Sequence, residues 1–335
     1  MAKHTVVLIP GDGIGPEVTR ATQRVLEAAG MSVEWVEMLA GASALEAGMD
    51  NVLPQRTLAA VTAHKIALKG PVTTPVGKGF KSVNVQLRQK LGLYAAVRPV
   101  RNLPGIQTRY EGVDLVIVRE NTEGLYSGIE NEIVPGVVTS LKVASRLACT
   151  RIARYAFAYA TRRHRKTVTV FHKANIMKLS DGLFLDCARQ IHADEFPGIE
   201  YKELIIDAGC MRLVQDPSRF DVLLMENLYG DLVSDLCAGL VGGLGVVPGS
   251  NIGDEAAIFE AVHGSAPDIA GRGIANPLAL IMSGVMMLNH LQETAVAEKI
   301  KHAYDTVLAD GNHLTVDLGG TTTTDGFADA IIAKL

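Results

Sequence analysis

The sequence predicts an α/β protein of two domains built on a largely parallel sheet. Short apolar runs alternate with longer segments of helical periodicity along the 335 residues, and this alternation is typical of strand–helix–strand units. A chain of this length also exceeds what one compact core usually covers. Glycine contributes 33 residues, which indicates many tight turns in an ordinary globular chain.

The expected strands are short apolar runs that suit buried positions. The first is Thr5–Ile9, and a glycine-rich turn follows it. The next helix begins at Pro16, where the fixed φ of proline suits a first helical turn, and runs to about Ala29. Further strands are expected at Ile66–Leu68, Val113–Val118, Val168–Phe171, Leu204–Ile206 and Val222–Leu224. Further helices are expected at Ser145–Arg162, Ser180–Ala193, Tyr229–Leu240, Pro277–Leu291 and Glu293–Leu308.

Composition argues against several classes of protein. The net charge of −4 does not suit a nucleic-acid binder, which carries a strong basic excess. The longest apolar stretch, Leu278–Leu288, is too short to cross a bilayer and is expected to form a buried helix. The apolar run near the N-terminus is too short for a secretory signal peptide. The four cysteines match no zinc pattern, so we expect reduced thiols and a cytoplasmic or mitochondrial-matrix location.

The turn Gly11-Asp12-Gly13-Ile14-Gly15 lies where a dinucleotide-binding loop would lie. Its spacing is G-x-G-x-G and differs from the G-x-G-x-x-G of that motif. Direct phosphate binding by this turn is therefore a minor alternative.

Paired carboxylates mark the segment from Asn227 to Asp235. On a helix, Asp231 and Asp235 are one turn apart and share a face. They are either a polar helix start, where carboxylates suit the dipole, or oxygen ligands of a hard divalent cation. Asp207, at the end of an expected strand, is a candidate third carboxylate.

Three arginines, Arg88, Arg98 and Arg119, flank expected strands and loops and not an amphipathic surface helix. Arginine binds carboxylates bidentately and stays charged. Together they suit a substrate with several carboxylates, although each one alone is more often part of a surface ion pair.

Two further segments carry candidate side chains. Tyr126 and Lys173 are each either structural, as a half-buried tyrosine and a strand-end lysine, or catalytic. In the stretch from Glu260 to Gly271, small residues permit close approach to a flat ligand, and Asp268 could accept ribose hydroxyls. A hydrolase built on Ser265 is excluded because the chain contains no G-x-S-x-G elbow.

These segments, in this order, resemble the decarboxylating dehydrogenases, a family that includes isocitrate, isopropylmalate and homoisocitrate dehydrogenases. The resemblance runs from Ile9–Glu17 to Asp317–Gly320, and its most specific motifs are Asn227-Leu228-Tyr229-Gly230-Asp231 and His263-Gly264-Ser265-Ala266-Pro267-Asp268. It implies the isopropylmalate dehydrogenase-like two-domain fold, which is not a Rossmann fold. Residues 1–98 and 250–335 would form a large cofactor domain, and residues 99–249 a small dimerisation domain with an arm near 131–142.

Within the family, the pattern Ser82-x-Asn84-x-x-x-Arg88 resembles isocitrate enzymes, and Asp268-Ile269 resembles the members that use NAD. A carboxylate at position 268 would also repel the 2′-phosphate of NADP. The resemblance therefore implies oxidative decarboxylation of isocitrate to 2-oxoglutarate and CO₂ with reduction of NAD. The alternatives are homoisocitrate, less favourably 3-isopropylmalate, or a role as one subunit of a heteromeric isocitrate dehydrogenase.

The resemblance also implies roles for single residues. Tyr126 would protonate the enol carbon, and Lys173 would act from the second subunit of a homodimer whose subunits share each active site. Mg²⁺ or Mn²⁺ would be held by Asp231, Asp235 and the partner subunit's Asp207. The implied substrate-binding residues are Thr74, Ser82, Asn84, Arg88, Arg98 and Arg119. The implied cofactor-binding residues are Glu260, His263, Gly264, Ser265, Ala266, Asp268, Ile269 and Asn276.

Overall fold

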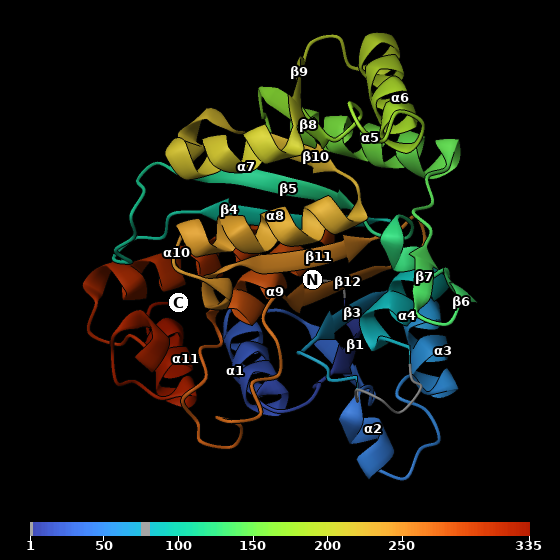
Figure 1. Ribbon diagram of the computed structural model, residues 1–335. Coiled ribbons are helices and arrows are strands. Elements are labelled where there is room, and N and C mark those ends of the chain that lie inside the picture. The colour runs from blue at the N-terminus through green and yellow to red at the C-terminus, as the bar shows by residue number, and fades with distance from the viewer. Residues whose placement is uncertain (1–2, 75–80) are drawn as a thin grey trace. The chain divides into compact units, whose positions relative to one another are not determined.

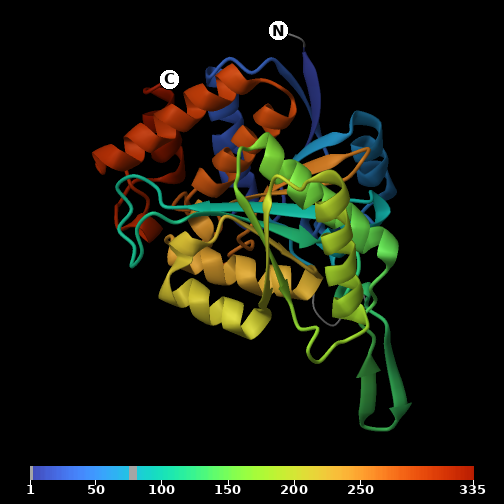
Figure 2. The ribbon, with the colours of Figure 1, turned by 90° about the horizontal axis from the view of Figure 1, so that it is seen from above.

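The computed structural model describes residues 3–74 and 81–335, and its elements are drawn in Figures 1 and 2. The chain divides into two compact units. The first unit comprises residues 1–92, 102–108 and 241–335, and the second comprises residues 93–101 and 109–240. Of the residues expected in the large domain, 1–2 and 75–80 lie outside the described ranges. The cofactor and dimerisation roles of the two expected domains stay predictions.

The strands of the first unit lie in the order β2-β1-β3-β12-β11. Neighbours in this order are parallel, except for the antiparallel pair of β11 and β12. The strands are β1 (His4–Ile9), β2 (Val33–Glu37), β3 (Ile66–Lys69), β11 (Pro248–Ile252) and β12 (Ala257–Ala261). The buried runs of β1, β3 and β12 give this sheet its core.

Helices of the first unit cover this sheet. The helix α9 (Leu278–His290) is buried along most of its length and packs on β11 and β12. The helices α1 (Gly15–Ala28) and α10 (Thr294–Asp310) pack against α9, and α11 (Thr324–Ile332) packs against both of these. The remaining elements are α2 (Ala42–Glu46), α3 (Gln55–His64), α4 (Val83–Lys90), η3 (Leu244–Val246) and η4 (Val316–Leu318).

The second unit is built on strands in the order β4-β5-β10-β8-β9. Here β4 and β5 are antiparallel and the other neighbours are parallel. The strands are β4 (Ala95–Arg101), β5 (Asp114–Glu120), β8 (Thr167–His172), β9 (Glu200–Ile205) and β10 (Val222–Met225). Parallel strands end at the same edge of a sheet, so the residues that follow β5, β8 and β10 gather there.

Two pairs of helices cover opposite faces of this sheet. The helices α5 (Arg146–Arg162) and α6 (Ser180–Glu195) form one pair, and α7 (Ile206–Gln215) and α8 (Asn227–Leu240) the other. Phe157 of α5 contacts the ring of Tyr201, while Gly209 of α7 lies against the ring of Phe171. Tyr201 pairs with Val168, three residues before Phe171 on β8. An odd spacing on a strand places the two rings on opposite faces.

A hairpin of β6 (Glu130–Val134) and β7 (Val137–Ser140) projects from the rest of the second unit (Figure 2). Nearly all of its side chains are exposed, including the apolar Ile133, Val134, Val137 and Val138. It falls in the segment where an arm was expected. Its part in dimerisation stays a prediction. The short η1 (Leu125–Ser127) and η2 (Pro217–Arg219) complete this unit.

Most of the expected strands and helices are present, and the mixed α/β class is confirmed. The strand expected at Leu204–Ile206 is wrong at its end, because Ile206 already begins α7 and Asp207 therefore lies on a helix. Arg88 also lies on a helix, α4, where a loop or strand neighbour was expected. Among the residues that the structure describes, no helix combines the length and apolar character needed to cross a bilayer.

Candidate active site

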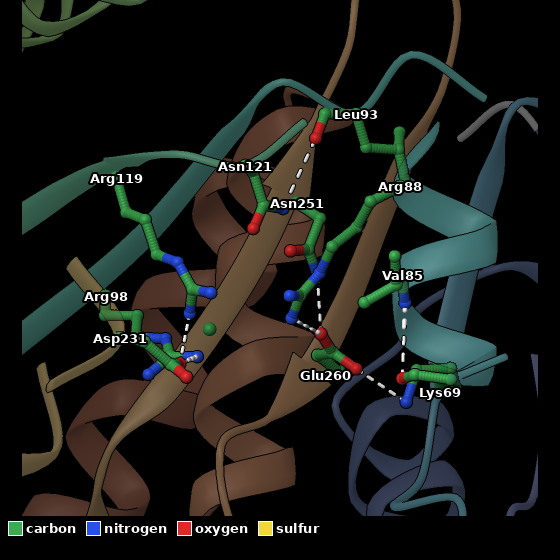
Figure 3. Close-up of polar contacts among 12 residues, drawn as sticks. Lys69, Val85, Arg88, Leu93, Arg98, Arg119, Asn121, Asp231, Asn251 and Glu260 are labelled. Atoms are coloured by element: carbon green, nitrogen blue, oxygen red, sulfur yellow. Dashed lines mark hydrogen bonds and ion pairs between the residues drawn. The ribbon is translucent and has the colours of Figure 1, made fainter. Parts of the chain in front are cut away.

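Two carboxylates of α8 form the centre of a polar cluster in the second unit, and Figure 3 shows one of them, Asp231, beside Arg98 and Arg119. Asp231 and Asp235 lie one turn apart, and the guanidinium of Arg98 contacts both, at 3.7 and 3.2 Å. Arg98 also donates to the hydroxyl of Ser234. The side chains of Asp231 and Asp235 are 35% and 56% exposed. Both carboxylates therefore remain accessible to a ligand.

Arg119, at the end of β5, is fully buried and reaches the same cluster. Its Nε and Nη2 donate to the amide oxygen of Asn227 at 3.1 and 2.7 Å, and its Nη1 donates to Asp231. A Cβ on Gly230 would lie 2.4 Å from the Cγ of Arg119. In the motif Asn227-x-x-Gly230-Asp231, the asparagine thus accepts hydrogen bonds from Arg119, the glycine leaves room for its side chain and the aspartate supplies the opposite charge.

Tyr126, on η1, donates its hydroxyl hydrogen to Asp231. The guanidinium carbon of Arg119 lies 5.1 Å from the centre of its ring. Burial raises the pKa of the Tyr126 hydroxyl, and the hydrogen bond to Asp231 raises it further. Tyr126 therefore keeps its proton at neutral pH and can donate it.

Lys173 follows β8 and donates from its Nζ to Asp207 at 2.6 Å. This hydrogen bond lowers the pKa of the exposed Asp207 carboxyl. The backbone N–H of Lys173 donates to the buried Asp181 at 2.7 Å, and Lys142 pairs with the same carboxylate at 2.6 Å. Lys173 is therefore held at both its backbone and its side chain.

The three aspartates expected at a metal site do not gather within this chain. Asp207 lies on α7 and pairs with Lys173, while Asp231 and Asp235 lie on α8 and contact the arginines. Within residues 3–74 and 81–335, no three His, Cys, Asp or Glu side chains form a group able to hold a metal. The single chain offers a pair of carboxylates on α8.

Glu226, directly before α8, accepts hydrogen bonds from the backbone N–H groups of Leu228 and Tyr229 at 3.3 and 3.1 Å. Burial raises the pKa of its carboxyl, although Lys142 lies 3.7 Å away. Glu226 is therefore a capping residue of α8.

In the first unit, Glu260 forms a buried ionic cluster (Figure 3). Lys69 contacts Glu260 at 2.5 Å, Asn251 donates to it at 2.6 Å and Arg88 lies 3.7 Å away. Burial by itself would raise the pKa of Glu260, but the two cations outweigh it and hold the pKa at about 2. Glu260 is therefore ionised throughout the physiological range.

The segment before Arg88 forms the start of α4. Ser82 is its N-cap and accepts from the backbone N–H of Val85 at 3.5 Å, while Thr74 accepts from that of Val83 at 3.1 Å. Asn84 and Arg88 are four residues apart and share a helical face. The buried Oδ1 of Asn84 has no hydrogen-bond partner among the described residues.

The loop after β12 carries the residues expected to bind a cofactor. The Nδ1 of His263 lies 3.0 Å from the carbonyl of Gly264, so Nδ1 carries the hydrogen and Nε2 is an acceptor. That Nε2 is buried and has no partner within the part of the chain that the structure describes. Burial lowers the pKa of His263. Ala266 has a positive φ of 38°, and Asp268 and Gly264 are exposed.

The family model for isocitrate/isopropylmalate dehydrogenases matches residues 5–331. The chain is 52% identical to the mitochondrial catalytic subunit 5 of NAD isocitrate dehydrogenase from Arabidopsis thaliana, over 99% of this chain and 88% of that protein. It is 50% identical to the chloroplastic 3-isopropylmalate dehydrogenase of Solanum tuberosum, over 91% of this chain and 85% of that protein. A crystal structure of isocitrate dehydrogenase from Methylococcus capsulatus matches with a TM-score of 0.94 and 51% identity, covering 99% of each chain.

The chain belongs to the isocitrate/isopropylmalate dehydrogenase family. The expected family and its two-domain fold are thereby confirmed. As a member of this family, the chain places Arg98, Arg119, Tyr126 and the two aspartates of α8 together in its second unit.

Some residues of this isocitrate/isopropylmalate dehydrogenase family member were not singled out by the sequence. Lys69 is 2% exposed and bonds Glu260. It is the last residue of a buried strand, and Lys173 directly follows one, so the same signal could have found it. Asn227 and Ser234 lie in or beside a motif that was recognised. Ser234 accepts from Arg98 of β4, and Asn227 accepts from Arg119 of β5. These contacts could be predicted only if one knew which strands lie beside α8.

Proposed function

We propose that this chain catalyses the oxidative decarboxylation of isocitrate to 2-oxoglutarate and CO₂, with NAD⁺ as the oxidant and Mg²⁺ or Mn²⁺ as the metal. The observation that carries this proposal is the cluster in which two buried arginines, a protonated tyrosine and two accessible carboxylates meet. Such a cluster combines anion binding, a proton donor and oxygen ligands for a cation.

The arginines suit a substrate with several carboxylates. Arg98 and Arg119 of the second unit are buried and permanently charged, and a bound carboxylate would receive charge-assisted hydrogen bonds from them. We also assign substrate binding to Arg88, Ser82, Asn84 and Thr74. The side-chain N–H₂ of Asn84 would donate to a substrate carboxylate.

The donor set on α8 fits a hard divalent cation. Mg²⁺ commonly takes one or two protein carboxylates and completes its octahedron with water and substrate oxygens, and Asp231 and Asp235 offer such a pair. We assign the partner subunit's Asp207 as a third ligand in a homodimer. When bound, the cation would lower the pKa of the substrate hydroxyl and stabilise negative charge as CO₂ leaves.

The loop after β12 fits a nicotinamide adenine dinucleotide. The buried, unprotonated Nε2 of His263 suits a donor such as the exocyclic amino group of adenine. The exposed carboxylate of Asp268 suits ribose hydroxyls and opposes a 2′-phosphate. We assign the rest of the cofactor contacts to Glu260, Gly264, Ser265, Ala266, Ile269 and Asn276. NAD⁺ would accept the hydride from C2 of the substrate.

We assign the two proton transfers to Lys173 of the partner subunit and to Tyr126. The partner subunit's Lys173 would assist removal of the hydroxyl proton as the hydride leaves. After CO₂ is lost, Tyr126 would donate its proton to the enol carbon, and its raised pKa keeps that proton available. A general acid placed in this way contributes roughly 10²–10⁴-fold to the rate.

A coupled substrate panel tests the proposal. The purified chain is assayed alone with isocitrate, homoisocitrate and 3-isopropylmalate, each with NAD⁺ and with NADP⁺, in Mg²⁺ and again after chelation. We expect activity with isocitrate and NAD⁺ that chelation abolishes and added Mn²⁺ restores. Preference for another of the three acids would contradict the substrate assignment. Activity that appears only with a second polypeptide would favour a heteromeric subunit, as the subunit name of the Arabidopsis relative suggests.

Assembly and location belong to the same proposal. We propose a homodimer in which each active site takes Lys173 and Asp207 from the other subunit. Mixing a Tyr126→Phe chain with a Lys173→Met chain tests this sharing. Mixed dimers would regain part of the activity, because one of their two sites would be intact. We place the enzyme in the cytoplasm or the mitochondrial matrix, where the coenzyme is available.

A further inference from the structure

The glycine-rich turn after β1 is not used by the proposed function, although the sequence marks it as a possible phosphate-binding loop. The space beside Gly11 and Gly13 is filled by backbone atoms of other loops, so the turn leaves no room there for a phosphate. A Cβ on Gly11 would lie 2.1 Å from the carbonyl oxygen of Pro71, and a Cβ on Gly13 would lie 2.0 Å from that of Ser265. The turn is therefore packed tightly against two other loops of the first unit.

The side chain of Asp12 is the centre of this packing. It is only 7% exposed. Its two oxygens accept hydrogen bonds from the backbone N–H groups of Ala42 at 3.0 Å, Ser43 at 2.8 Å and Thr73 at 2.5 Å. In return, the backbone N–H of Asp12 donates to the carbonyl of Pro71 at 2.7 Å. One carboxylate thus fixes the start of α2 and the segment of residues 71–73 that follows β3.

Two hydrogen bonds connect these segments to the loop after β12. The hydroxyls of Thr73 and Ser265 are 2.6 Å apart and share a hydrogen bond. The backbone N–H of Ile14, two residues after Asp12, donates to the carbonyl of Ser265 at 2.9 Å. Ser265 is thereby held on both its side chain and its backbone, next to Ala266 with its positive φ of 38°.

We infer that Asp12 is a positioning residue that holds the loop His263–Asp268 in the conformation that binds the dinucleotide. It acts through Thr73 and Ser265, and it does not touch the cofactor itself. The positive φ of Ala266 is a conformation that an alanine seldom adopts without support from its neighbours. A charge-assisted set of three backbone hydrogen bonds behind Ser265 supplies that support. The inference rests on the proposed role of this loop in NAD binding.

The test compares Asp12→Asn with a matched control. Asn keeps the size of the side chain but loses the charge and turns an amide N–H₂ toward backbone donors. The control, Thr57→Val, removes a buried hydrogen bond to the carbonyl of Leu39 in the same unit. For each protein, the dissociation constant of NADH is measured by its fluorescence. Amide hydrogen exchange is followed in the peptide covering 263–268.

We expect Asp12→Asn to weaken NADH binding about tenfold and to speed exchange in the loop by a similar factor, because charged hydrogen bonds are lost. The KM for NAD⁺ should rise in parallel, while kcat at saturating NAD⁺ changes little. Thr57→Val should leave NADH binding and loop exchange unchanged, even if it lowers the thermal stability as much as Asp12→Asn does. A folded Asp12→Asn protein with unchanged binding and unchanged loop exchange would overturn the inference.

If Asp12→Asn does not fold, Thr73→Val takes its place, because it breaks the hydroxyl pair with Ser265 and keeps the carboxylate. Thr73→Val should weaken NADH binding several-fold, and an unchanged dissociation constant would overturn the inference. A wild-type chain that binds no NADH would contradict the proposed function itself. Hydrogen exchange in the loop can be measured without cofactor. In that case, a comparison of exchange between the wild type and Asp12→Asn would decide by itself whether Asp12 positions Ser265.

Discussion

The guanidinium of Arg119 lies over the ring of Tyr126, 5.1 Å from its centre, and both side chains donate to the same carboxylate, that of Asp231. This arrangement gives the proposed acid a fixed direction. The hydroxyl cannot turn freely, because the ring is held from one side by Arg119 and the oxygen by Asp231.

Removal of this hydroxyl should affect chemistry far more than binding. We expect Tyr126→Phe to lower kcat roughly 10²–10⁴-fold and to leave the dissociation constant of NADH nearly unchanged. Steady-state kinetics and NADH fluorescence measure the two quantities. Tyr110→Phe, which removes a hydroxyl contact with the carbonyl of Val214 in the same unit, is the control and should retain normal turnover. An unchanged kcat in Tyr126→Phe would exclude Tyr126 from the mechanism.

The glycine beneath Arg119 offers a second test. A methyl group at position 230 would lie 2.4 Å from the Cγ of Arg119, so the arginine must shift. We expect Gly230→Ala to raise the KM for isocitrate about tenfold and to cost about 1–3 kcal/mol of unfolding free energy. Initial rates and urea unfolding measure these effects.

The same helix contains the control for that substitution. Gly239 is exposed on α8, and no atom lies within 4 Å of a Cβ built on it. Gly239→Ala should therefore keep the KM of the wild type and add about 0.5–1 kcal/mol of stability through helix propensity. Equal KM values for the two alanine variants would show that Arg119 does not bind the substrate.

Lys69, at the end of β3, forms a buried ion pair, whereas Lys65, just before β3, forms an exposed one. Lys69 and Glu260 are 2% and 11% exposed, whereas Lys65 and Glu255 are 59% and 81% exposed. We expect Glu260→Gln to lower the unfolding free energy by about 3–5 kcal/mol, because Lys69 is left buried without its counter-charge. Glu255→Gln should leave it nearly unchanged, because that pair is exposed to solvent. Denaturant unfolding of both variants checks this, and similar losses would contradict the burial of the Lys69–Glu260 pair.

Two glutamates of the second unit should show opposite dependence of stability on pH. Burial raises the pKa of Glu226 above its ordinary 4.5, so its folded state holds a proton that the unfolded state has released. Relative to Glu226→Gln, the wild type should therefore lose stability as pH rises from 4.5 through the raised pKa.

Glu203 has a lowered pKa, first of all because Arg189 donates hydrogen bonds to it. Its contribution is present above pH 4.5 and is lost as pH falls through the lowered pKa. Relative to Glu203→Gln, the wild type should therefore gain stability as pH rises. Urea unfolding of the three proteins between about pH 3 and pH 8 measures both trends. Parallel curves for the two variants would contradict the assignment of burial to Glu226 and of the arginine contact to Glu203.

The sequence predicted β1, β3, β5, β8 and β10, which are short apolar runs. It missed β2, β4 and β12, although β12 is apolar and buried along its whole length. It misplaced the end of β9, because Leu204, Ile205 and Ile206 form one apolar run that passes from strand into helix without a turn residue. It did not predict β11, Pro248–Ile252, whose proline, glycine and polar residues are unusual for a strand. The antiparallel pairing of β11 with β12 supplies the backbone partners that this segment lacks locally.

At the candidate site, helical spacing was enough to place Asp231 and Asp235 on one face, and the contacts of Arg98 with both confirm that prediction. The depth of Arg119, the reason for Gly230 and the pairing of Lys69 with Glu260 could not be predicted in this way. Each depends on two elements far apart in the chain that lie side by side only after folding.

The chain passes from one unit to the other after Gly92, Arg101, Thr108 and Leu240. Neither unit is therefore encoded by one uninterrupted stretch of the gene. A single recombination event within the coding region would always divide the residues of the first unit between the parental sequences, because that unit includes both ends of the chain. Exchange of a whole unit between relatives would need several simultaneous breakpoints, so new substrate preferences in such a chain are expected to arise by point substitution and not by shuffling of domains.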